Sequence, residues 1–303
     1  MKMKSNVLIT GGLGYIGSHL YLSLIEKGHD ACIVDDLSNS HLNVAKHLEK
    51  FIKKRIKLYI GKVQDKELLK KIILDNKIDS VFHLAAYKSV EESSLFPAKY
   101  YENNINSTLA LLDVLDETKC SKIIFSSSAS VYGNQGSSPL KENNELNPLN
   151  VYAHTKIISE KIIKMYSTIN QDLKYVSLRY FNPAGAHESG LIGEFSKEKP
   201  KNLFPVISML ANKNNAKLDI FGSDYNTRDG TPIRDYIHIM DLVEGHIKAL
   251  DCLNKNNKNS KNITVNLGTG KGQTVLEVLS AYNRIFEKNL KFQFKDRRQG
   301  DSE

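Results

Sequence analysis

Short apolar runs rich in β-branched residues recur along the first part of the chain, and each has the length of one buried strand. These runs lie at residues 6–10, 31–35, 56–60, 80–84, 122–126 and 175–179. Leucine and isoleucine recur at helical spacing between them, at residues 15–27, 66–74, 98–117 and 152–166. This alternation predicts an α/β fold of the Rossmann type, a doubly wound parallel sheet with helices on both faces. Ligands are expected at the carboxyl ends of its strands.

The alternation breaks after Asn182, where the chain becomes rich in Gly, Pro and Asn. Apolar periodicity returns at residues 241–253, 263–267 and 274–287. We therefore predict a dinucleotide-binding Rossmann domain at residues 1–182. A smaller C-terminal lobe for the substrate is predicted at residues 183–303, interleaved with returning Rossmann elements.

Composition narrows the class of protein. No window approaches the roughly 18 uninterrupted apolar residues of a membrane span, and the apolar run at residues 7–10 is too short for a signal peptide. The cysteines Cys32, Cys120 and Cys252 lie far apart and lack metal-ligand spacing, so we expect reduced core thiols and no metal. These features predict a cytoplasmic protein that does not enter a membrane.

The formal net charge of +8 does not predict nucleic-acid binding. The excess lies in Lys and Asn runs, such as residues 50–57 and 255–261, and no aromatic residues alternate with those lysines. Solvated helix faces and loops explain such runs better. An acidic substrate such as a diphosphate would still benefit from the positive field.

A glycine loop follows the first predicted strand, with Gly11, Gly14 and Gly17 three residues apart. Glycine at these places permits a tight turn, lets backbone N–H groups approach a pyrophosphate, and lets helix and strand pack closely. Asp35 and Asp36 end the second strand, at the place where an acid meets the adenosine ribose. An acid there favours NAD over NADP. The plainer alternative is a tight turn with a capping aspartate.

A second motif places Tyr152 and Lys156 four residues apart, on one face of a predicted helix. An adjacent cation and a positive nicotinamide ring both favour phenolate, so Tyr152 is a candidate base. Ser128, at the end of an upstream strand, is placed to reach the same reacting oxygen. The spacing alone also fits an exposed helix pair, and the surrounding residues favour the catalytic interpretation.

Together these features resemble the extended short-chain dehydrogenases/reductases, and within them the UDP-glucose 4-epimerase family. The resemblance extends over nearly the whole chain. It rests on the segments at residues 35–40, 85–93, 100–108, 126–133, 179–187, 202–205, 230–242 and 297–301.

The resemblance implies an NAD-dependent isomerase of galactose metabolism that interconverts UDP-galactose and UDP-glucose through a 4-keto sugar. It implies Ser128, Tyr152 and Lys156 as catalytic residues. Its implied NAD contacts are Gly11, Gly14, Tyr15, Ile16, Gly17, Asp35, Asp36, Asn39, Ser40, Val63, Leu84, Ala85, Ala86, Lys88, Asn103, Ser126, Tyr152, Lys156 and Tyr180. Its implied substrate contacts are Ser128, Tyr152, Asn182, Asn202, Leu203, Phe221, Arg234, Arg298 and Asp301. It also implies a homodimer through the helices at residues 98–117 and 152–166.

Two departures from the family pattern stand out. Lys62 occupies a place where the family usually has an acid that meets the adenine amine, and Asp65 is a candidate substitute. The chain ends at Glu303, where family members continue, so a C-terminal truncation is expected. The segment that governs acceptance of N-acetylated sugars in the family lies beyond that point.

Three alternatives remain open: another nucleotide-sugar epimerase, a dehydratase and an inactive binding module. A dehydratase needs an Asp-Glu pair beside the serine strand, where this chain has Ala129 and Ser130. Without the resemblance, Arg234 also fits a surface ion pair with Asp235 or Asp229. The histidines in or beside apolar segments are expected to be structural, namely His83, His238 and His246.

Overall fold

Seven parallel strands form the main sheet, in the order β10-β6-β5-β4-β1-β2-β3. The computed structural model describes residues 4–135, 138–195, 197, 199–211, 213, 216–255 and 262–298. The strands are β1 (Asn6–Thr10), β2 (Asp30–Asp35), β3 (Lys57–Ile60), β4 (Ser80–His83), β5 (Lys122–Ser128), β6 (Lys174–Tyr180) and β10 (Ile263–Leu267). The strand order reverses between β1 and β4, which makes a crevice there the expected ligand site.

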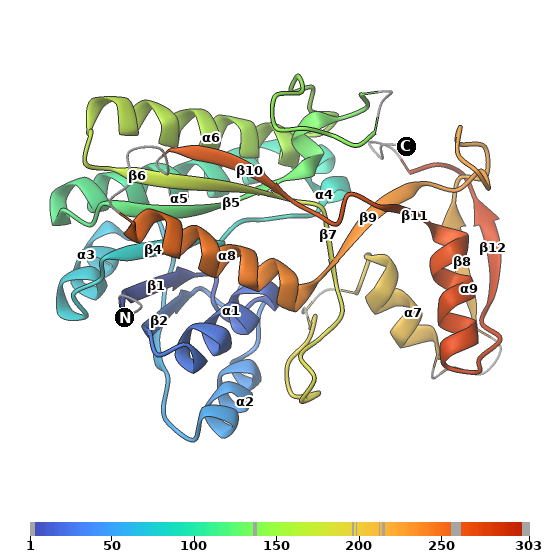
Figure 1. Cartoon of the computed structure of the whole chain (residues 1–303), viewed down its shortest axis with the longest axis horizontal. Coiled ribbons are helices and arrows are strands. Elements are labelled where there is room, and N and C mark those ends of the chain that lie inside the picture. The colour runs from blue at the N-terminus through green and yellow to red at the C-terminus, as the bar shows by residue number, and fades with distance from the viewer. Residues whose placement is uncertain are drawn as a thin grey trace.

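Helices cover both faces of this sheet (Figure 1). One layer contains α1 (Tyr15–Glu26), α2 (Leu42–Ile52) and α8 (Ile239–Asn254), and the other contains α3 (Lys66–Asp75), α4 (Val90–Leu95), α5 (Pro97–Thr118) and α6 (Val151–Ile169). Successive strand residues face opposite layers, so Val7 and Ile9 join the core under α1 and α8, while Leu8 joins the core under α3 and α5. This is the predicted doubly wound fold.

The smaller part extends from the middle of the molecule, where β7 lies, to its right-hand end in Figure 1. It contains β7 (Asn182–Ala184), β8 (Lys217–Phe221), β9 (Ile233–His238), β11 (Gly272–Thr274), β12 (Lys291–Lys295), α7 (Leu203–Ala211) and α9 (Val275–Ile285). Strand β9 pairs with β7 and β11, β8 pairs with β12, and α7 and α9 share an apolar core with β8. Because α8 and β10 return to the main sheet, the chain crosses between the two parts several times.

Most predicted elements are present, with ends that differ by a few residues. Strand β5 continues two residues beyond its apolar run and ends at Ser128, as predicted, because Ser127 and Ser128 still pair with Arg179 and Tyr180 of β6. The sequence pattern did not predict α2, α4 and α7, nor the strands of the smaller part. Those strands are short and partly exposed, so they lack the apolar run that marks a buried strand.

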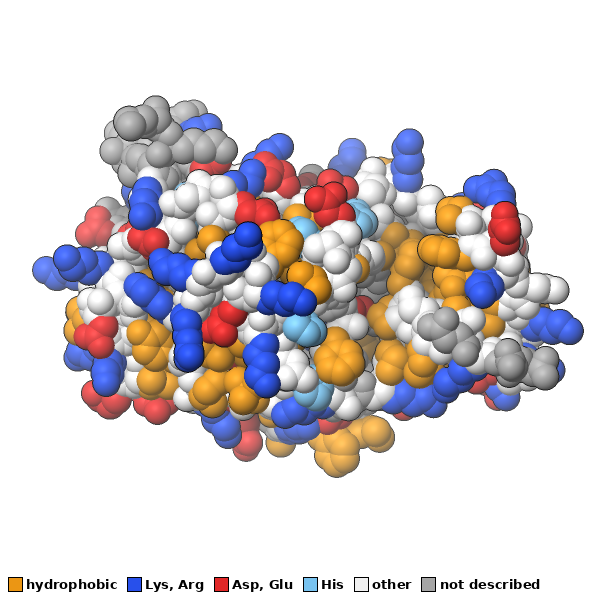
Figure 2. Space-filling model, turned by 90° about the horizontal axis from the view of Figure 1, so that it is seen from below, with side chains coloured by type: hydrophobic (Ala, Val, Ile, Leu, Met, Phe, Trp, Pro, Cys, Tyr) orange, Lys and Arg blue, Asp and Glu red, His pale blue; other side chains and the backbone are white. Residues whose placement is uncertain are grey.

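Lys and Arg side chains do not gather into one basic face on the side shown in Figure 2. They are interspersed there with acidic and apolar side chains. Within the ranges described above, no helix has the length and apolar character needed to cross a membrane.

Candidate active site

The glycine loop joins β1 to α1 beside the end of β4. Gly11 has a φ of 69°, and a Cβ on it would lie 3.0 Å from the backbone of Ala85. A Cβ on Gly17 would lie 2.5 Å from the carbonyl oxygen of Gly11. A side chain at Gly11 would push the loop away from the end of β4, and a side chain at Gly17 would push α1 away from the loop. The close packing of β4, the loop and α1 therefore depends on glycine.

The amino end of α1 is shaped for an anion. Gly14 is the N-cap and has no side chain to bond the first amides of the helix, which are the backbone N–H groups of Tyr15, Ile16 and Gly17. Unpaired amides and the helix dipole attract a phosphate group. The Tyr15 hydroxyl donates to the carbonyl oxygen of Gly185 at 2.6 Å, so this helix end is tied to the segment after β7.

Asp35 binds the glycine loop. Its carboxylate accepts hydrogen bonds from the Leu13 amide at 3.0 Å and the Ser40 hydroxyl at 2.6 Å. Asp36 is more open and accepts from the Ser38 amide at 2.9 Å. Asp35 therefore sets the position of the loop, and the carboxylates of both residues lie at the end of β2, where a ribose contact was predicted.

The other predicted cofactor residues lie along the same edge of the sheet. The amides of Leu84 and Ala85 donate to the Thr10 hydroxyl at 3.1 and 3.2 Å, which holds the end of β4 against β1. The side-chain oxygen of Asn103, on α5, accepts from Gln64 Nε2 at 3.2 Å. The remaining predicted contacts follow the ends of β2, β3 and β4 or lie in the last residues of β5 and β6, namely Asn39, Val63, Ala86, Lys88, Ser126 and Tyr180.

Tyr152 and Lys156 lie on α6, next to the end of β5. The Lys156 ammonium donates to the carbonyl oxygen of Ser126 at 2.7 Å and lies 5.8 Å from the centroid of the Tyr152 ring. Asn150 starts the helix, because its side chain accepts from the Ala153 amide at 2.9 Å. The cap and the lysine contact fix the first turn of α6 against the serine strand, so Tyr152, Lys156 and Ser128 come together as predicted.

Burial controls the proton affinities of this pair. It lowers the pKa of Lys156 to about 7, and the Glu160 carboxylate acts in the opposite direction. It also raises the pKa of Tyr152, which a hydrogen bond with Ser128 partly offsets. A positive ring placed beside Tyr152 would stabilise its phenolate and lower that pKa again.

A buried ion pair lies one turn further along α6 and was not predicted. The Glu160 carboxylate accepts from Arg179 Nε at 3.0 Å and from Arg179 Nη2 at 2.7 Å. It also accepts from the Ser127 hydroxyl, while Arg179 Nη1 donates to the Tyr132 hydroxyl at 2.9 Å. The sequence held a signal for it, since Arg179 interrupts an apolar strand and Glu160 follows Lys156 by four residues.

Two of the three histidines are buried and hydrogen-bonded, as predicted. His83 contacts the Thr10 hydroxyl at 2.9 Å, and His246 contacts the Leu242 carbonyl oxygen at 2.8 Å and the Tyr180 hydroxyl. His238 is exposed, yet its role is also structural, because Nδ1 accepts from the Met240 amide at the start of α8.

The predicted substrate residues come from the smaller part and its connections. The Arg298 guanidinium stacks on the Phe221 ring, 3.8 Å from its centroid, and reaches the Lys201 carbonyl oxygen at 3.5 Å. Asn202 and Leu203 start α7 next to that carbonyl. Stacking leaves most of the guanidinium donors of Arg298 available to an anion. Asp301 lies outside the described residues.

Asn182 and Arg234 lie on the paired strands β7 and β9. Asn182 donates to the Asp235 carbonyl oxygen at 3.3 Å, and Arg234 donates to the Ile233 carbonyl oxygen at 2.8 Å. The Asp235 carboxylate bonds instead to Thr269, with Oγ1 at 2.6 Å.

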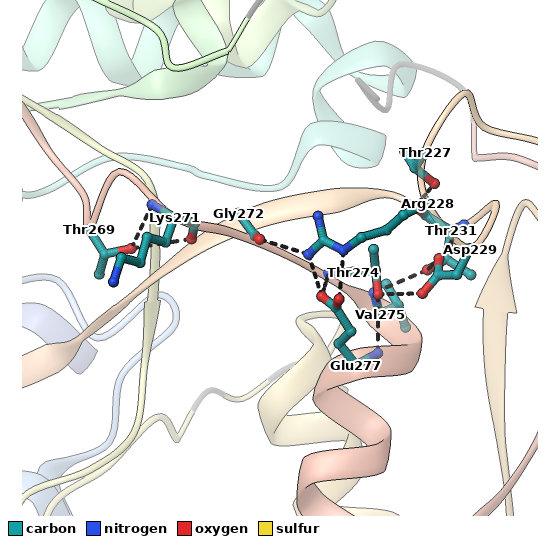
Figure 3. A network of polar contacts seen from close by, with 10 residues as sticks. All are labelled: Thr227, Arg228, Asp229, Thr231, Thr269, Lys271, Gly272, Thr274, Val275 and Glu277. Carbon is teal, nitrogen blue, oxygen red and sulfur yellow. Dashed lines mark hydrogen bonds and ion pairs between the residues drawn. The ribbon is translucent and has the colours of Figure 1, made fainter.

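Asp229, the second acid considered as an ion-pair partner of Arg234, also has other hydrogen-bond partners. Asp229 belongs to the network in Figure 3, where it accepts hydrogen bonds from Thr231 and Thr274. In the same network Arg228 pairs with Glu277, which forms a capping box with Thr274 at the start of α9. These contacts secure the junction of β11 and α9, and the network is structural.

The expectation of three core thiols is correct for two of the cysteines. Cys32 and Cys120 are buried, but Cys252 is only half-buried, so it is not a core thiol. The Asp65 side chain accepts from the Leu68 amide at 3.0 Å as the cap of α3, and Lys62 is exposed. The described residues contain no group of three His, Cys, Asp or Glu side chains arranged for a metal ion.

Comparison with known proteins identifies the relatives of this chain. The sequence model of the NAD dependent epimerase/dehydratase family matches residues 7–268. UDP-glucose 4-epimerase from Dictyostelium discoideum is 43% identical over 295 residues, which cover 97% of this chain and 85% of that protein. The Bacillus subtilis UDP-glucose 4-epimerase is 40% identical over 296 residues, covering 97% and 86%. The crystal structure of UDP-glucose 4-epimerase from Bifidobacterium longum with NAD+ and UDP has a TM-score of 0.93 at 40% identity, covering 98% and 88%.

Proposed function

The chain belongs to the NAD dependent epimerase/dehydratase family, and we propose that it is a UDP-glucose 4-epimerase that interconverts UDP-galactose and UDP-glucose with bound NAD. The observation that carries this function is the meeting of Tyr152, Lys156 and Ser128 at the end of β5, beside the strand reversal where the glycine loop lies. The relatives are named UDP-glucose 4-epimerases, and Tyr152, Lys156 and Ser128 are the groups that the family resemblance implies for that reaction.

The described residues fit a dinucleotide whose ribose hydroxyls donate to carboxylates of the protein. The uncapped amides of α1 would hold the pyrophosphate, and the Asp35 and Asp36 carboxylates would accept from the ribose hydroxyls. Lys88, Asn103 and the carboxyl ends of β4 and β5 would line the rest of the cofactor. When bound, NAD would supply the redox chemistry, as the acceptor and donor of the hydride at sugar carbon C4.

Tyr152 moves the proton that this reaction requires. Its phenolate takes the proton of the 4-hydroxyl as the C4–H bond breaks, so that C4 becomes a carbonyl carbon, and it gives the proton back after the 4-keto sugar has turned in the site. The Ser128 hydroxyl would donate to the C4 oxygen. Lys156, held by the Ser126 carbonyl oxygen, would orient the nicotinamide ribose and favour the phenolate. The proton and the hydride both return to the sugar, so the reaction is an isomerisation.

The uridine diphosphate would bind to residues of the smaller part and of its connections to the main sheet. Arg298, stacked on Phe221, offers a planar donor set for the diphosphate, and Asn202 and Leu203 offer groups at the start of α7. Asn182 and Arg234 would contact the same nucleotide from β7 and β9. A dehydratase reaction lacks support, because Ala129 and Ser130 occupy the short helix after β5 where elimination would need an acid and a base.

We also propose a cytoplasmic homodimer. Helices α5 and α6 pack on each other, and α6 exposes Met165 and Ile169 at 60% and 81% of their surface. Large exposed apolar side chains on a helix favour burial against a partner. The free thiols of Cys32 and Cys120 fit a reducing compartment. Light scattering tests the oligomeric state, and a monomer at micromolar concentration would contradict the dimer.

One assay tests the proposed activity. The purified protein is incubated with UDP-galactose, with and without added NAD, and the nucleotide sugars are separated by chromatography. UDP-glucose is the expected product. A dehydrated product would support the alternative reaction, and unchanged UDP-galactose with saturating NAD would contradict the epimerase.

A further inference from the structure

One carboxylate oxygen connects the predicted cofactor site with the predicted substrate site. Glu194 lies between β7 and α7, and its Oε1 accepts from Lys88 Nζ at 3.3 Å and from Asn202 Nδ2 at 2.9 Å. Lys88 follows β4 of the main sheet, whereas Asn202 precedes α7 of the smaller part. Lys88 lies 106 residues from Glu194 in the sequence, whereas Asn202 lies 8 residues from it.

The surroundings of Glu194 make this contact more than a surface ion pair. The Glu194 side chain is 17% exposed, while that of Lys88 is 55% exposed. A carboxylate withdrawn from water needs donors, and both of its donors are predicted ligand contacts. Glu194 also lies close enough to Tyr15 to raise the pKa of that phenol, in addition to the larger effect of burial.

The segment that carries Glu194 is fastened at several other points. Gly185 accepts from the Tyr15 hydroxyl, and the Lys197 amide donates to Asn39 Oδ1 at 3.2 Å. The Lys201 ammonium donates to Glu91 Oε2 at 2.8 Å. The segment therefore crosses the edge of the main sheet from the predicted ribose residues toward α4. Among these anchors, Glu194 is the one that joins a predicted NAD contact to a predicted substrate contact.

We propose that Glu194 is a positioning residue for both ligands: it holds the Lys88 ammonium for NAD and the Asn202 amide for the uridine nucleotide. This inference rests on the proposed function and on the roles predicted for Lys88 and Asn202. Lysine loses much rotamer freedom when it binds a ligand, and a carboxylate that orients it beforehand lowers that entropic cost. Because one oxygen serves both donors, each ligand stabilises the arrangement that the other requires, and this coupling is reciprocal.

Two substitutions separate the two halves of the proposal. Glu194→Ala removes both contacts, so we expect the Kd for UDP and the KM for UDP-galactose to rise about tenfold, kcat to change less, and NAD to be lost faster on dilution. Glu194→Gln keeps an acceptor oxygen for Asn202 and loses the charge that faces Lys88. We expect it to restore UDP affinity to within about twofold while NAD retention stays reduced, because only the Lys88 contact depends on that charge.

The matched control is Glu91→Ala. This substitution removes the ion pair between Glu91 on α4 and Lys201, which belongs to the same segment as Glu194. Because the Glu91 side chain is 71% exposed, we expect wild-type affinity for both ligands. Calorimetry measures the affinity for UDP. Gel filtration, followed by measurement of the NAD that stays with the protein, gives NAD retention. Thermal unfolding confirms that each variant is folded.

Several results would overturn the inference. They are wild-type UDP affinity and NAD retention in folded Glu194→Ala, equal losses in Glu91→Ala, and, if the alanine variant does not fold, wild-type NAD retention in Glu194→Gln. The proposed function has a separate readout. A wild-type protein that binds NAD and UDP but does not convert UDP-galactose would contradict the epimerase, while the binding data would still decide the role of Glu194.

Discussion

Glu160 on α6 and Arg179 on β6 form a two-pronged ion pair, with Nε to Oε1 at 3.0 Å and Nη2 to Oε2 at 2.7 Å. Their side chains are only 9% and 6% exposed. The pair joins α6 to β6, and the Ser127 hydroxyl adds β5. The residues next to this junction, Lys156 and Ser128, are the predicted catalytic groups, so the ion pair supports the geometry of the site.

Removing one partner of this pair should destabilise the protein strongly. Glu160→Ala leaves a buried guanidinium without its carboxylate, which costs about 3–5 kcal/mol of the free energy of unfolding. Urea denaturation measures the change. The control is Lys27→Ala, which breaks a half-exposed ion pair with Glu244 and should shift the midpoint little. Equal midpoints for the two variants would contradict a structural role for the buried pair.

Tyr152→Phe should abolish most turnover while it preserves ligand binding. The substitution removes the hydroxyl that carries the proton, and loss of such a group lowers kcat by about 10²- to 10⁴-fold. Steady-state kinetics and calorimetry with UDP measure the two quantities. Tyr101→Phe is the matched control, because its hydroxyl contacts His154 on α6 at 2.7 Å and lies outside the predicted site. A Tyr152→Phe variant with wild-type kcat would remove Tyr152 as the base.

The buried Lys156 should make stability rise with pH in one defined window. Burial lowers its pKa from the ordinary 10.5 to about 7 in the folded protein. Below pH 7 both states carry the proton, and above pH 10.5 neither does. Between these values the unfolded state binds more protons than the folded state, so the free energy of unfolding increases with pH.

Comparison with Lys156→Met isolates this contribution. The stability of the wild type relative to the variant should increase from pH 7 to pH 10, as measured by urea denaturation at several pH values. A constant or falling difference over that range would show that Lys156 keeps its proton in the folded protein.

Arg298→Ala should weaken the binding of UDP. The guanidinium is stacked on Phe221 and has donors available for a diphosphate, and a hydrogen bond to a charged group contributes about 1.5–3 kcal/mol. Calorimetry with UDP should show a Kd raised by roughly tenfold or more. The neighbouring Arg297 packs on Tyr225 and pairs with Asp224, so Arg297→Ala is the control with nearly unchanged Kd. Similar losses in the two variants would argue against a specific role for Arg298.

The main sheet and the principal motifs were predictable because their signals are local. An apolar run, a helical spacing or a Gly-x-x-Gly-x-x-Gly loop is complete within a few residues, and the structure has the doubly wound sheet and the helix of Tyr152 and Lys156 at the predicted places. Strand β5 extends beyond its apolar run through Ser127 and Ser128, because both residues pair with β6.

Contacts between distant residues were beyond the reach of these local patterns. Glu160 contacts Arg179 on a neighbouring strand, and Glu194 contacts Lys88 across 106 residues. Local spacing identifies the partner of neither glutamate. Asp35, expected at a ribose, also holds the amide of Leu13. Backbone periodicity records which face of an element is buried, whereas the partner of a charged side chain depends on which elements pack together, and that is settled when the chain folds.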